Sequence, residues 1–386
     1  MYFCIKQFER PCREGDIIYI KRSMAISSVK IGITIGDKNG IGPEVIIKAL
    51  EDPRILSGFT PVIYGCPIVI EHYKKALNLE QLKVKEISSA DKAENNKINL
   101  LNVSTEKSTV NEGKEEESSG KLAILAIQKA SEDISSGKID AIVTAPISKS
   151  VCQNAGFDFP GHTEFFISLS NGAEGLMILT SSLMKIALVT THVPLKDVSE
   201  SISKESIVTK AEVFHQSLQK DFGILNPKIA ILSLNPHSGE NGKIGKEEIE
   251  VQTPAINELR AKGILAFGPF ATDGFFGSAA PSNYDGILAM YHDQGLSVFK
   301  ALSFDEGVNY TAGLPIVRTS PDHGTAFDIA GKNLASENSM RQALYSAVDI
   351  FVNRIRFKEV QANPLPIIKR DPIDKWRSKA KDSKKN

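Results

Sequence analysis

The architecture of this chain is predicted first from one segment, Ile287-Leu288-Ala289-Met290-Tyr291-His292-Asp293-Gln294-Gly295. Its four apolar residues follow Asp285-Gly286 and predict a short buried strand. The polar residues come directly after this strand, at the position where α/β proteins place ligand chemistry. Taken alone, a histidine at a strand end is more often a hydrogen-bonded structural residue than a ligand, so the prediction depends on the rest of the chain.

Two further apolar runs end in the same way. Ile186-Ala187-Leu188-Val189 precedes His192, and Ile229-Ala230-Ile231-Leu232 precedes His237. Three strands that each end in a histidine predict three imidazoles at one edge of a sheet. Neutral imidazole binds zinc, cobalt, nickel, copper or iron, and three protein ligands leave coordination positions open for a substrate. His192, His237 and His292 are therefore candidate ligands of a divalent metal ion.

Strand and helix patterns alternate along the chain, which predicts a doubly wound α/β architecture. Val29 to Ile35 is rich in β-branched residues and predicts the first buried strand. A glycine-rich turn follows, and Pro43 and Glu44 then suit the start of a helix. Such a turn can hold an anion at the helix N-terminus. It can equally be a tight turn that needs glycine geometry, and it matches neither a P-loop nor a GxGxxG fingerprint.

The composition excludes several classes of function. The 386 residues include 46 Lys+Arg and 46 Asp+Glu, so the formal net charge is zero and nothing favours nucleic acid or an acidic membrane surface. No apolar run approaches the roughly 20 residues that span a bilayer. The four cysteines show no metal-binding spacing, which predicts free thiols in a reducing cytoplasm. We therefore expect a cytoplasmic protein with no nucleic-acid or membrane partner.

Three segments are expected to lie outside regular structure. Residues 1–28 mix apolar and charged residues and do not form a signal peptide, and translation could begin at Met24. Residues 87–120 are polar, and their charge run predicts a solvated loop or insertion. Residues 363–386 are proline-punctuated and then rich in lysine, which is typical of a mobile tail.

Further candidate site residues lie beyond the predicted strands. His162 is at a predicted helix start, where capping or packing is an alternative to ligand binding. Asp273 is in a predicted loop and either faces the site or caps a turn. Lys300, Asn309 and Arg318 supply donors suited to phosphate or carboxylate. Taken singly, each of these three is also compatible with a solvated surface position.

Seven motifs occur in one order along the chain, and they are Gly36-Asp37 through Glu44, Thr144-Ala145-Pro146, Gly161-His162-Thr163-Glu164, Thr191-His192-Val193-Pro194-Leu195, Asn235-Pro236-His237, Tyr291-His292-Asp293-Gln294-Gly295 and Asp322-His323-Gly324-Thr325. Together they resemble the 4-hydroxythreonine-4-phosphate dehydrogenase family of vitamin B6 biosynthesis. The resemblance covers Val29 to Phe357. One difference is Lys38, which stands where the family usually has proline; it loosens the turn but removes no obvious catalytic group.

The resemblance implies an isopropylmalate-dehydrogenase-like α/β fold with two α/β/α domains and a cleft between them. The first domain would comprise residues 29–154 plus 332–358, and the second residues 155–331. The resemblance also implies a homodimer whose active site lies at the interface, with ligands shared between the subunits. NAD is bound without a Rossmann fingerprint in such enzymes, which agrees with the missing GxGxxG.

The resemblance also implies a role for each candidate residue. One divalent metal ion (zinc, magnesium or cobalt) would bind His192, His237 and His292. The phosphorylated substrate would contact His162, Thr163, Lys300, Asn309 and Arg318. NAD or NADP would lie near Asp322, His323, Gly324 and Asp328. The proton acceptor would be Lys300 or Asp273.

The reaction that the resemblance implies is NAD-dependent oxidation of 4-phosphooxy-L-threonine at its 3-hydroxyl. Decarboxylation to 3-amino-2-oxopropyl phosphate would follow. One alternative is a same-family dehydrogenase of another phosphorylated hydroxy acid, such as a four-carbon sugar-acid phosphate. A second is a phosphate-acyl transferase of related fold, which would need neither NAD nor a three-histidine metal site. A third is a non-catalytic binding protein, against which the intact histidines and Lys300 count.

Overall fold

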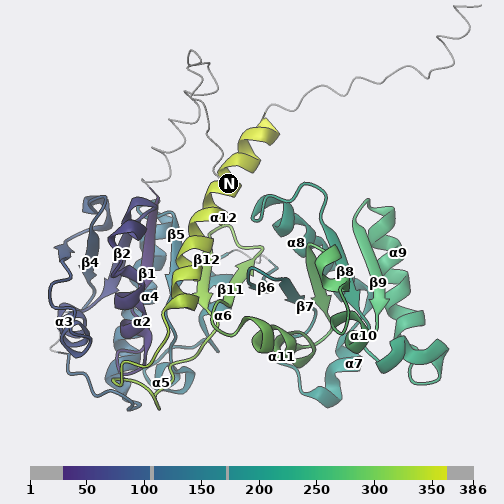
Figure 1. Cartoon of the computed structure of the whole chain (residues 1–386), viewed down its shortest axis with the longest axis horizontal. Coiled ribbons are helices and arrows are strands. Elements are labelled where there is room, and N and C mark those ends of the chain that lie inside the picture. The colour runs from purple at the N-terminus through teal and green to yellow at the C-terminus, as the bar shows by residue number, and fades with distance from the viewer. Residues whose placement is uncertain (1–28, 105–107, 171–173, 363–386) are drawn as a thin grey trace, which may run out of the picture.

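The computed structural model describes residues 29–104, 108–170 and 174–362, so the predicted extension (1–28) and lysine-rich tail (363–386) lie outside the described residues. One sheet of 12 strands runs through the described chain, in the order β3-β4-β2-β1-β5-β12-β11-β6-β7-β10-β8-β9 (Figure 1). Helices alternate with the strands along the chain. The predicted doubly wound α/β architecture is confirmed.

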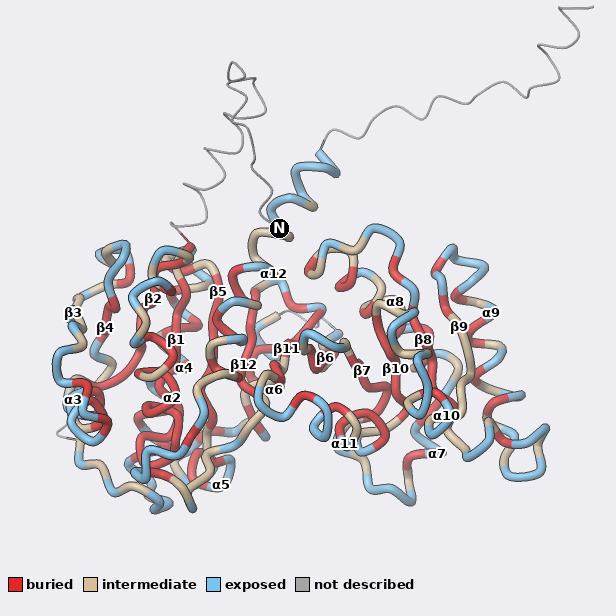
Figure 2. The backbone as a smooth tube through the Cα atoms, in the orientation of Figure 1, coloured by how far each residue is buried: buried red, intermediate tan, exposed pale blue. Residues whose placement is uncertain are grey.

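The first half of the sheet contains parallel strands, namely β3 (Val84–Ile87), β4 (Ile98–Asn102), β2 (Thr60–Gly65), β1 (Lys30–Thr34), β5 (Ala141–Thr144) and β12 (Arg318–Pro321). Its helices are α2 (Gly42–Leu50), α3 (Pro67–Ala76), α4 (Glu117–Ser135), α5 (Lys149–Asn154) and α12 (Asn338–Ala362). The central strands β2, β1, β5 and β12 are largely buried (Figure 2), and Ile31 and Ile33 of β1 have no exposed surface. Burial on both faces explains why β1, β2 and β5 are rich in apolar residues.

The second half contains another parallel set, namely β7 (Lys185–Leu188), β10 (Gly286–Ala289), β8 (Lys228–Leu232) and β9 (Leu265–Phe270). Its helices are α6 (His162–Ser168), α7 (Val198–Ser201), α8 (Lys204–Lys220), α9 (Thr253–Ala261), α10 (Thr272–Phe276) and α11 (His292–Ser303). Short 3-10 or π segments are η1 (Pro53–Ser57), η2 (Ala90–Lys92), η3 (Leu195–Asp197), η4 (Pro236–Gly242), η5 (Glu248–Gln252) and η6 (Ala280–Asn283). The three strands predicted to end in histidine are therefore β7, β10 and β8, which are neighbours in the sheet.

Two strands join the halves. β11 (Val308–Ala312) pairs antiparallel with β12 and with β6 (Leu176–Thr180), and β6 pairs antiparallel with β7. The two parallel sets consequently run in opposite directions and meet in the middle of one continuous sheet. Helix α12 lies against this middle region, in contact with β5, β12 and β11 (Figure 1). Ligand sites in α/β proteins form where the strand arrangement changes in this way.

A buried ion-pair network fastens α12 to the second half. The Arg354 guanidinium donates to Asp221 Oδ1 (2.7 Å) and to the Tyr310 hydroxyl (2.9 Å), and that hydroxyl donates to Asp221 Oδ2 (2.7 Å). Burial, followed by the Asp221 carboxylate, raises the pKa of Tyr310 well above its usual value. The apolar pattern of the sequence predicts a last helix from Ser339 to Val352, whereas α12 continues to Ala362, so Arg354 lies beyond the predicted end.

Two loop predictions were wrong. The polar stretch 87–120 contains β4, which pairs with β2 and β3, and α4 begins within its charge run. The polar residue Asn99 interrupts the apolar pattern of β4, so the strand was not recognised from the sequence. Asn99 is nevertheless fully buried, and its side-chain amide donates to the carbonyl oxygens of Pro61, Glu94 and Lys97. The predicted loop at 268–276 is instead the end of β9 and all of α10.

In the described residues, we find no helix with the length and apolar character needed to cross a membrane.

Candidate active site

A cavity of about 300 Å³ lies where the two parallel sets meet, and both halves of the chain line it. Most of the candidate residues are found here, namely His162, Thr163, His192, Lys300, Asn309, Arg318, Asp322, His323 and Gly324. They come from α6, the segment after β7, α11, β11, and β12 with its following loop. The central strands therefore bring together residues that are far apart in the sequence.

Arg318 is the centre of this cavity's electrostatics. It is the first residue of β12 and only 3% exposed. Its guanidinium donates from Nε (3.1 Å) and Nη2 (2.6 Å) to Thr144 Oγ1, and from Nη1 to Thr311 Oγ1 (3.3 Å). Burial lowers the pKa of Arg318 to about 10, and the nearby Glu164 carboxylate opposes this only in part. No described carboxylate lies within 4.0 Å of the guanidinium, so a buried cation faces the cavity without a counter-ion.

Three other polar atoms in this cavity have no hydrogen-bond partner among the described residues. They are His162 Nε2, Asn309 Oδ1 and His323 Nε2, and all three are buried. Buried polar atoms in native proteins are almost always paired, so unpaired ones indicate a missing ligand or water. Because they surround the same space as Arg318, they define a site for a polar, anionic molecule.

The two histidines are uncharged. Burial, together with the Arg318 and Lys149 cations, holds the pKa of His162 well below its usual value. Burial also lowers the pKa of His323, whose Nδ1 lies 3.1 Å from the Gly324 carbonyl oxygen. A neutral ring that donates from Nδ1 presents Nε2 as an acceptor. His323 can therefore accept a hydrogen bond from a ligand hydroxyl or amide.

Lys300 and Asp322 form an ion pair on the rim. Lys300 Nζ lies 3.4 Å from Asp322 Oδ1 and 3.3 Å from the Asp322 carbonyl oxygen. Burial raises the pKa of Asp322, and Lys300 opposes that shift. The lysine side chain is 47% exposed and Asp322 only 15%, so the ammonium can reach a ligand while its partner stays fixed.

The candidate metal ligands are only partly assembled in one chain. The rings of His192 and His292 lie 6.3 Å apart, and His292 Nδ1 is 2.6 Å from Asp293 Oδ1. A histidine held in this way by a carboxylate keeps its other nitrogen for a metal. His237 lies in η4, is exposed, and adopts a left-handed backbone (φ 53°). Across the described ranges, no group of three or more His, Cys, Asp or Glu side chains is close enough to hold a metal ion.

Two candidates lie apart from the cavity. Asp273 is an exposed residue of α10, and Asp328 is exposed in the loop that follows β12. Neither is among the residues that line the cavity. Asp273 belongs to the segment that was wrongly predicted as a loop, and the α10 helix fixes it on the surface.

The sequence reasoning missed several residues that line the cavity, including Thr144, Lys149, Glu164 and Met177. Thr144 matters most because it accepts two hydrogen bonds from Arg318. Its position directly after the apolar run at 139–143 was a usable signal, since residues at strand ends commonly face ligands. The Glu164 carboxylate favours the charged form of Arg318, and the Lys149 cation helps to lower the pKa of His162.

Comparisons with known proteins find relatives along most of this chain. Residues 58–347 match the family described as "Pyridoxal phosphate biosynthetic protein PdxA". A 4-hydroxythreonine-4-phosphate dehydrogenase from Bacteroides thetaiotaomicron is 49% identical over 356 residues, which cover 91% of this chain and 98% of that protein. A relative from Oceanobacillus iheyensis, provisionally named a D-threonate 4-phosphate dehydrogenase, is 40% identical over 83% of this chain and 97% of its own.

A solved structure has the same fold. The 4-hydroxythreonine-4-phosphate dehydrogenase from Klebsiella pneumoniae superposes with a TM-score of 0.73 at 35% identity, covering 84% of this chain and 98% of that chain. The α/β fold class expected from the sequence is confirmed. Fold and site together define an enzyme of the dehydrogenase class. The chain belongs to the PdxA family of pyridoxal phosphate biosynthetic proteins, as the ordered motifs predicted.

Proposed function

We propose that this enzyme oxidises 4-phosphooxy-L-threonine at its 3-hydroxyl with NAD, and that decarboxylation then gives 3-amino-2-oxopropyl phosphate. The observation that carries the proposal is the buried Arg318 guanidinium, which has hydroxyl partners but no described counter-ion. A planar guanidinium is suited to bidentate binding of a phosphate. The names of the relatives, which give a phosphorylated amino acid as substrate, support the same assignment.

Substrate binding is assigned to the residues around Arg318. The phosphate accepts hydrogen bonds from Arg318, and the Lys300 amine contacts the substrate at its 3-hydroxyl. Neutral His162 and the Asn309 amide, whose buried atoms have no described partner, complete the contacts to the substrate together with Thr163. Fixing the phosphate at one end positions the 3-hydroxyl for reaction at the other.

The cofactor is assigned to the loop after β12, where Asp322, His323 and Gly324 line the cavity and Asp328 follows. Hydride passes from C3 of the substrate to the nicotinamide, and the hydroxyl proton passes to a base. We assign Lys300 as that base, because Asp273 is exposed outside the cavity. The product is a 2-amino-3-oxo acid, whose ketone accepts the electron pair released when the carboxylate leaves as carbon dioxide.

A divalent metal ion (zinc, magnesium or cobalt) is part of this proposal. His192 and His292 are already neighbours, Asp293 orients His292, and His237 follows the adjacent strand, so the donors fit such an ion. When bound, the ion would lower the pKa of the substrate hydroxyl and stabilise negative charge on its oxygen. We further propose that a homodimer completes this donor set, because the described histidines of one chain do not close a site by themselves.

We also propose that the chain divides into domains at residues 29–154 plus 332–358 and 155–331, and that the enzyme is cytoplasmic. The first proposal is supported by the sheet order, in which β1 to β5 lie together in the first half and β7 to β10 lie together in the second, with β12 crossing back to pair with β5. The second is supported by the unpaired buried cysteines, Cys66 and Cys152, which are typical of a reducing compartment.

A second substrate deserves a direct test. The Oceanobacillus iheyensis relative is named for D-threonate 4-phosphate, which has a 2-hydroxyl group where the amino acid has an amine. Both molecules have a phosphate for Arg318, so the lining residues discriminate between them only at the second carbon. A four-carbon sugar-acid phosphate is therefore the alternative substrate.

The test is NADH formation by the full chain with each substrate, with and without a chelator. Chelator-sensitive turnover of 4-phosphooxy-L-threonine would support the proposed reaction and metal site. Turnover of D-threonate 4-phosphate alone would keep the site and reassign the substrate. If the protein binds a divalent metal and yet oxidises no phosphorylated hydroxy acid, the proposed dehydrogenase reaction is refuted.

A further inference from the structure

One buried chain of hydrogen bonds joins the three strand ends that precede the candidate metal ligands. Strands β7, β10 and β8 lie side by side in the sheet (Figure 1). In each following segment a buried residue comes shortly before the histidine, and the pairs are Thr190 and His192, Met290 and His292, and Ser233 and His237. The backbone at the buried residues therefore determines where the three imidazoles can lie.

Met290, the residue after β10, is the centre of this chain of hydrogen bonds. Its carbonyl oxygen accepts from the Thr190 backbone N–H (3.1 Å) and from Thr190 Oγ1 (2.8 Å). Its own N–H donates to Gln294 Oε1 (2.7 Å). Thr190 is 8% exposed and Gln294 is 7% exposed, so water competes little for these bonds. Met290 thus connects the segment after β7 to the first turn of α11.

Gln294 extends the chain of hydrogen bonds to the next strand. Its Nε2 donates to the Ser233 carbonyl oxygen (2.6 Å), directly after β8, and to Thr272 Oγ1 (2.8 Å) at the start of α10. The oxygen and both amide hydrogens of Gln294 are therefore used. An ionised glutamate has no hydrogen to donate to Ser233, and methionine has neither the donor nor the acceptor, so neither can replace this glutamine.

The histidine side chains lie toward solvent. His192 and His237 are exposed, and His292 is half-buried. Exposed side chains keep rotamer freedom, whereas metal–ligand distances tolerate deviations of only about 0.2 Å. The backbone that carries the histidines must therefore be held in place, and the buried chain of hydrogen bonds does this across all three strands.

We propose that Thr190 and Gln294 are positioning residues of the metal centre. Their hydrogen bonds hold the ends of β7, β10 and β8 at fixed separations, so that the histidines that follow are placed for one ion. Neither residue is itself a candidate ligand. The inference rests on the metal site of the proposed function. If the ligands of one site come from two subunits, the same hydrogen bonds hold each histidine within its own subunit.

Binding of Co²⁺ to the metal-free full chain tests the proposal, and the readouts are the dissociation constant and the visible absorption of the bound ion. We expect Gln294→Met, which removes the amide, to weaken Co²⁺ binding about ten-fold and to alter the absorption spectrum, as the loss of an outer-shell hydrogen bond does. Thr190→Val should act in the same direction, whereas Thr190→Ser, which keeps the hydroxyl, should bind like the wild type. His292→Ala should abolish the absorption, which would assign the signal to this site.

Two control variants remove buried hydrogen bonds in the first half of the chain. Asn99→Leu removes an amide that donates to three carbonyl oxygens, and Thr60→Val removes a hydroxyl that donates to Asn95 Oδ1 (2.9 Å). Both should lower the free energy of unfolding and leave Co²⁺ binding unchanged. The controls separate positioning from general stability, because a merely structural loss does not change the affinity of the folded protein.

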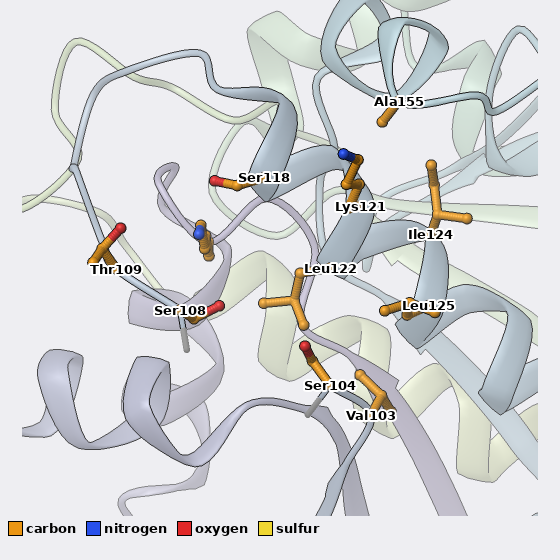
Figure 3. Close-up of a pocket in the computed structure, with 11 residues that line it drawn as sticks. Val103, Ser104, Ser108, Thr109, Ser118, Lys121, Leu122, Ile124, Leu125 and Ala155 are labelled. Carbon is orange, nitrogen blue, oxygen red and sulfur yellow. The ribbon is translucent and has the colours of Figure 1, made fainter. Parts of the chain in front are cut away.

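Among the described residues, the larger cavity of the first half offers no competing site for Co²⁺. This cavity of about 500 Å³ lies between α4 and the segment after β4 (Figure 3). Its described lining residues, which include Ser118, Leu122 and Leu125, contain no His, Cys, Asp or Glu. Because such side chains supply the usual protein ligands of Co²⁺, the absorption reports on the histidines.

Weaker Co²⁺ binding in Gln294→Met and Thr190→Val, with unchanged binding in both controls, would support the positioning role. Wild-type affinity in these two variants, a Thr190→Ser that binds as weakly as Thr190→Val, or an equal loss in the controls would refute the positioning role and leave the metal site in place. A wild-type chain that takes up no Co²⁺ would refute the proposed metal site, and the positioning role with it.

Discussion

Replacing Arg318 by methionine should raise stability while it removes activity. The pKa of this buried side chain falls from its ordinary value to about 10. At about 1.4 kcal/mol per pH unit, this corresponds to roughly 3 kcal/mol of unfavourable free energy in the folded, ligand-free protein. A base with a lowered folded pKa carries this cost at neutral pH, and the cost is relieved only as the pH rises through about 10 toward the unfolded value.

Part of that gain is offset in the Arg318→Met variant. Thr144 and Thr311 each lose a donor, at a cost of about 1 kcal/mol each. The net expectation is a ligand-free protein that is about 1 kcal/mol more stable to urea unfolding at neutral pH. Arg54→Met, which removes a 90% exposed arginine side chain, serves as the control and should change stability by less than about 1 kcal/mol.

The same substitution should strongly reduce turnover. Two charge-assisted hydrogen bonds to a phosphate contribute about 3 to 6 kcal/mol together. We therefore expect kcat/KM for the phosphorylated substrate, measured by NADH formation, to fall at least about 100-fold. A variant that is destabilised by more than about 2 kcal/mol, or whose kcat/KM stays within about three-fold of the wild type, would refute this account of Arg318.

Three further predictions concern groups around Arg318. Thr144→Val removes the acceptor of two guanidinium hydrogen bonds, so KM should rise about ten-fold with a smaller change in kcat; an unchanged KM would contradict the positioning role. Because the pKa of His162 is depressed in the folded state, the free energy of unfolding should decrease as the pH falls below about 6.5. Between pH 7 and pH 5, the free energy of unfolding in urea should therefore depend less on pH in His162→Gln than in the wild type. The same pH dependence in both proteins would count against a buried neutral imidazole. A Cβ at Gly40 would lie 2.8 Å from the Thr325 carbonyl oxygen, so Gly40→Ala should displace the loop proposed to hold the cofactor and raise the KM for NAD about ten-fold, whereas wild-type cofactor kinetics would disprove the link.

Runs of apolar residues predicted the central strands of the sheet, because these strands are buried on both faces. The apolar runs at 186–189, 229–232 and 287–290 correspond to β7, β8 and β10. Strand β4 was not predicted because the polar residue Asn99 lies within it. Asn99 is fully buried, and only the three-dimensional structure shows the carbonyl groups that accept its hydrogen bonds. The α12 helix was predicted too short, because Arg354 is charged yet buried by a partner that lies far away in the sequence.

The candidate site was predicted as a set of residues but not as a geometry. The strand-end pattern singled out His192 and His292, whose ring centroids lie 6.3 Å apart. The contact between Arg318 and Thr144 joins positions 174 residues apart, and it depends on β12 pairing with β5, which no local pattern encodes. For the same reason the sequence could not tell that Asp273 would be carried on a surface helix.

The continuous sheet has a consequence for how the molecule forms and comes apart. Strand β12 is completed late in the chain, yet it hydrogen-bonds to β5 and to β11, which in turn pairs with β6. Forming such long-range strand pairs requires the closure of long loops, and the entropy lost is offset only after the strands have paired, so folding should be slow. Since β11, β12 and the Arg354–Asp221 pair connect the halves, neither half retains a complete sheet when the other is lost. We therefore expect one cooperative unfolding transition for the whole chain, detectable by coincident fluorescence and circular dichroism curves.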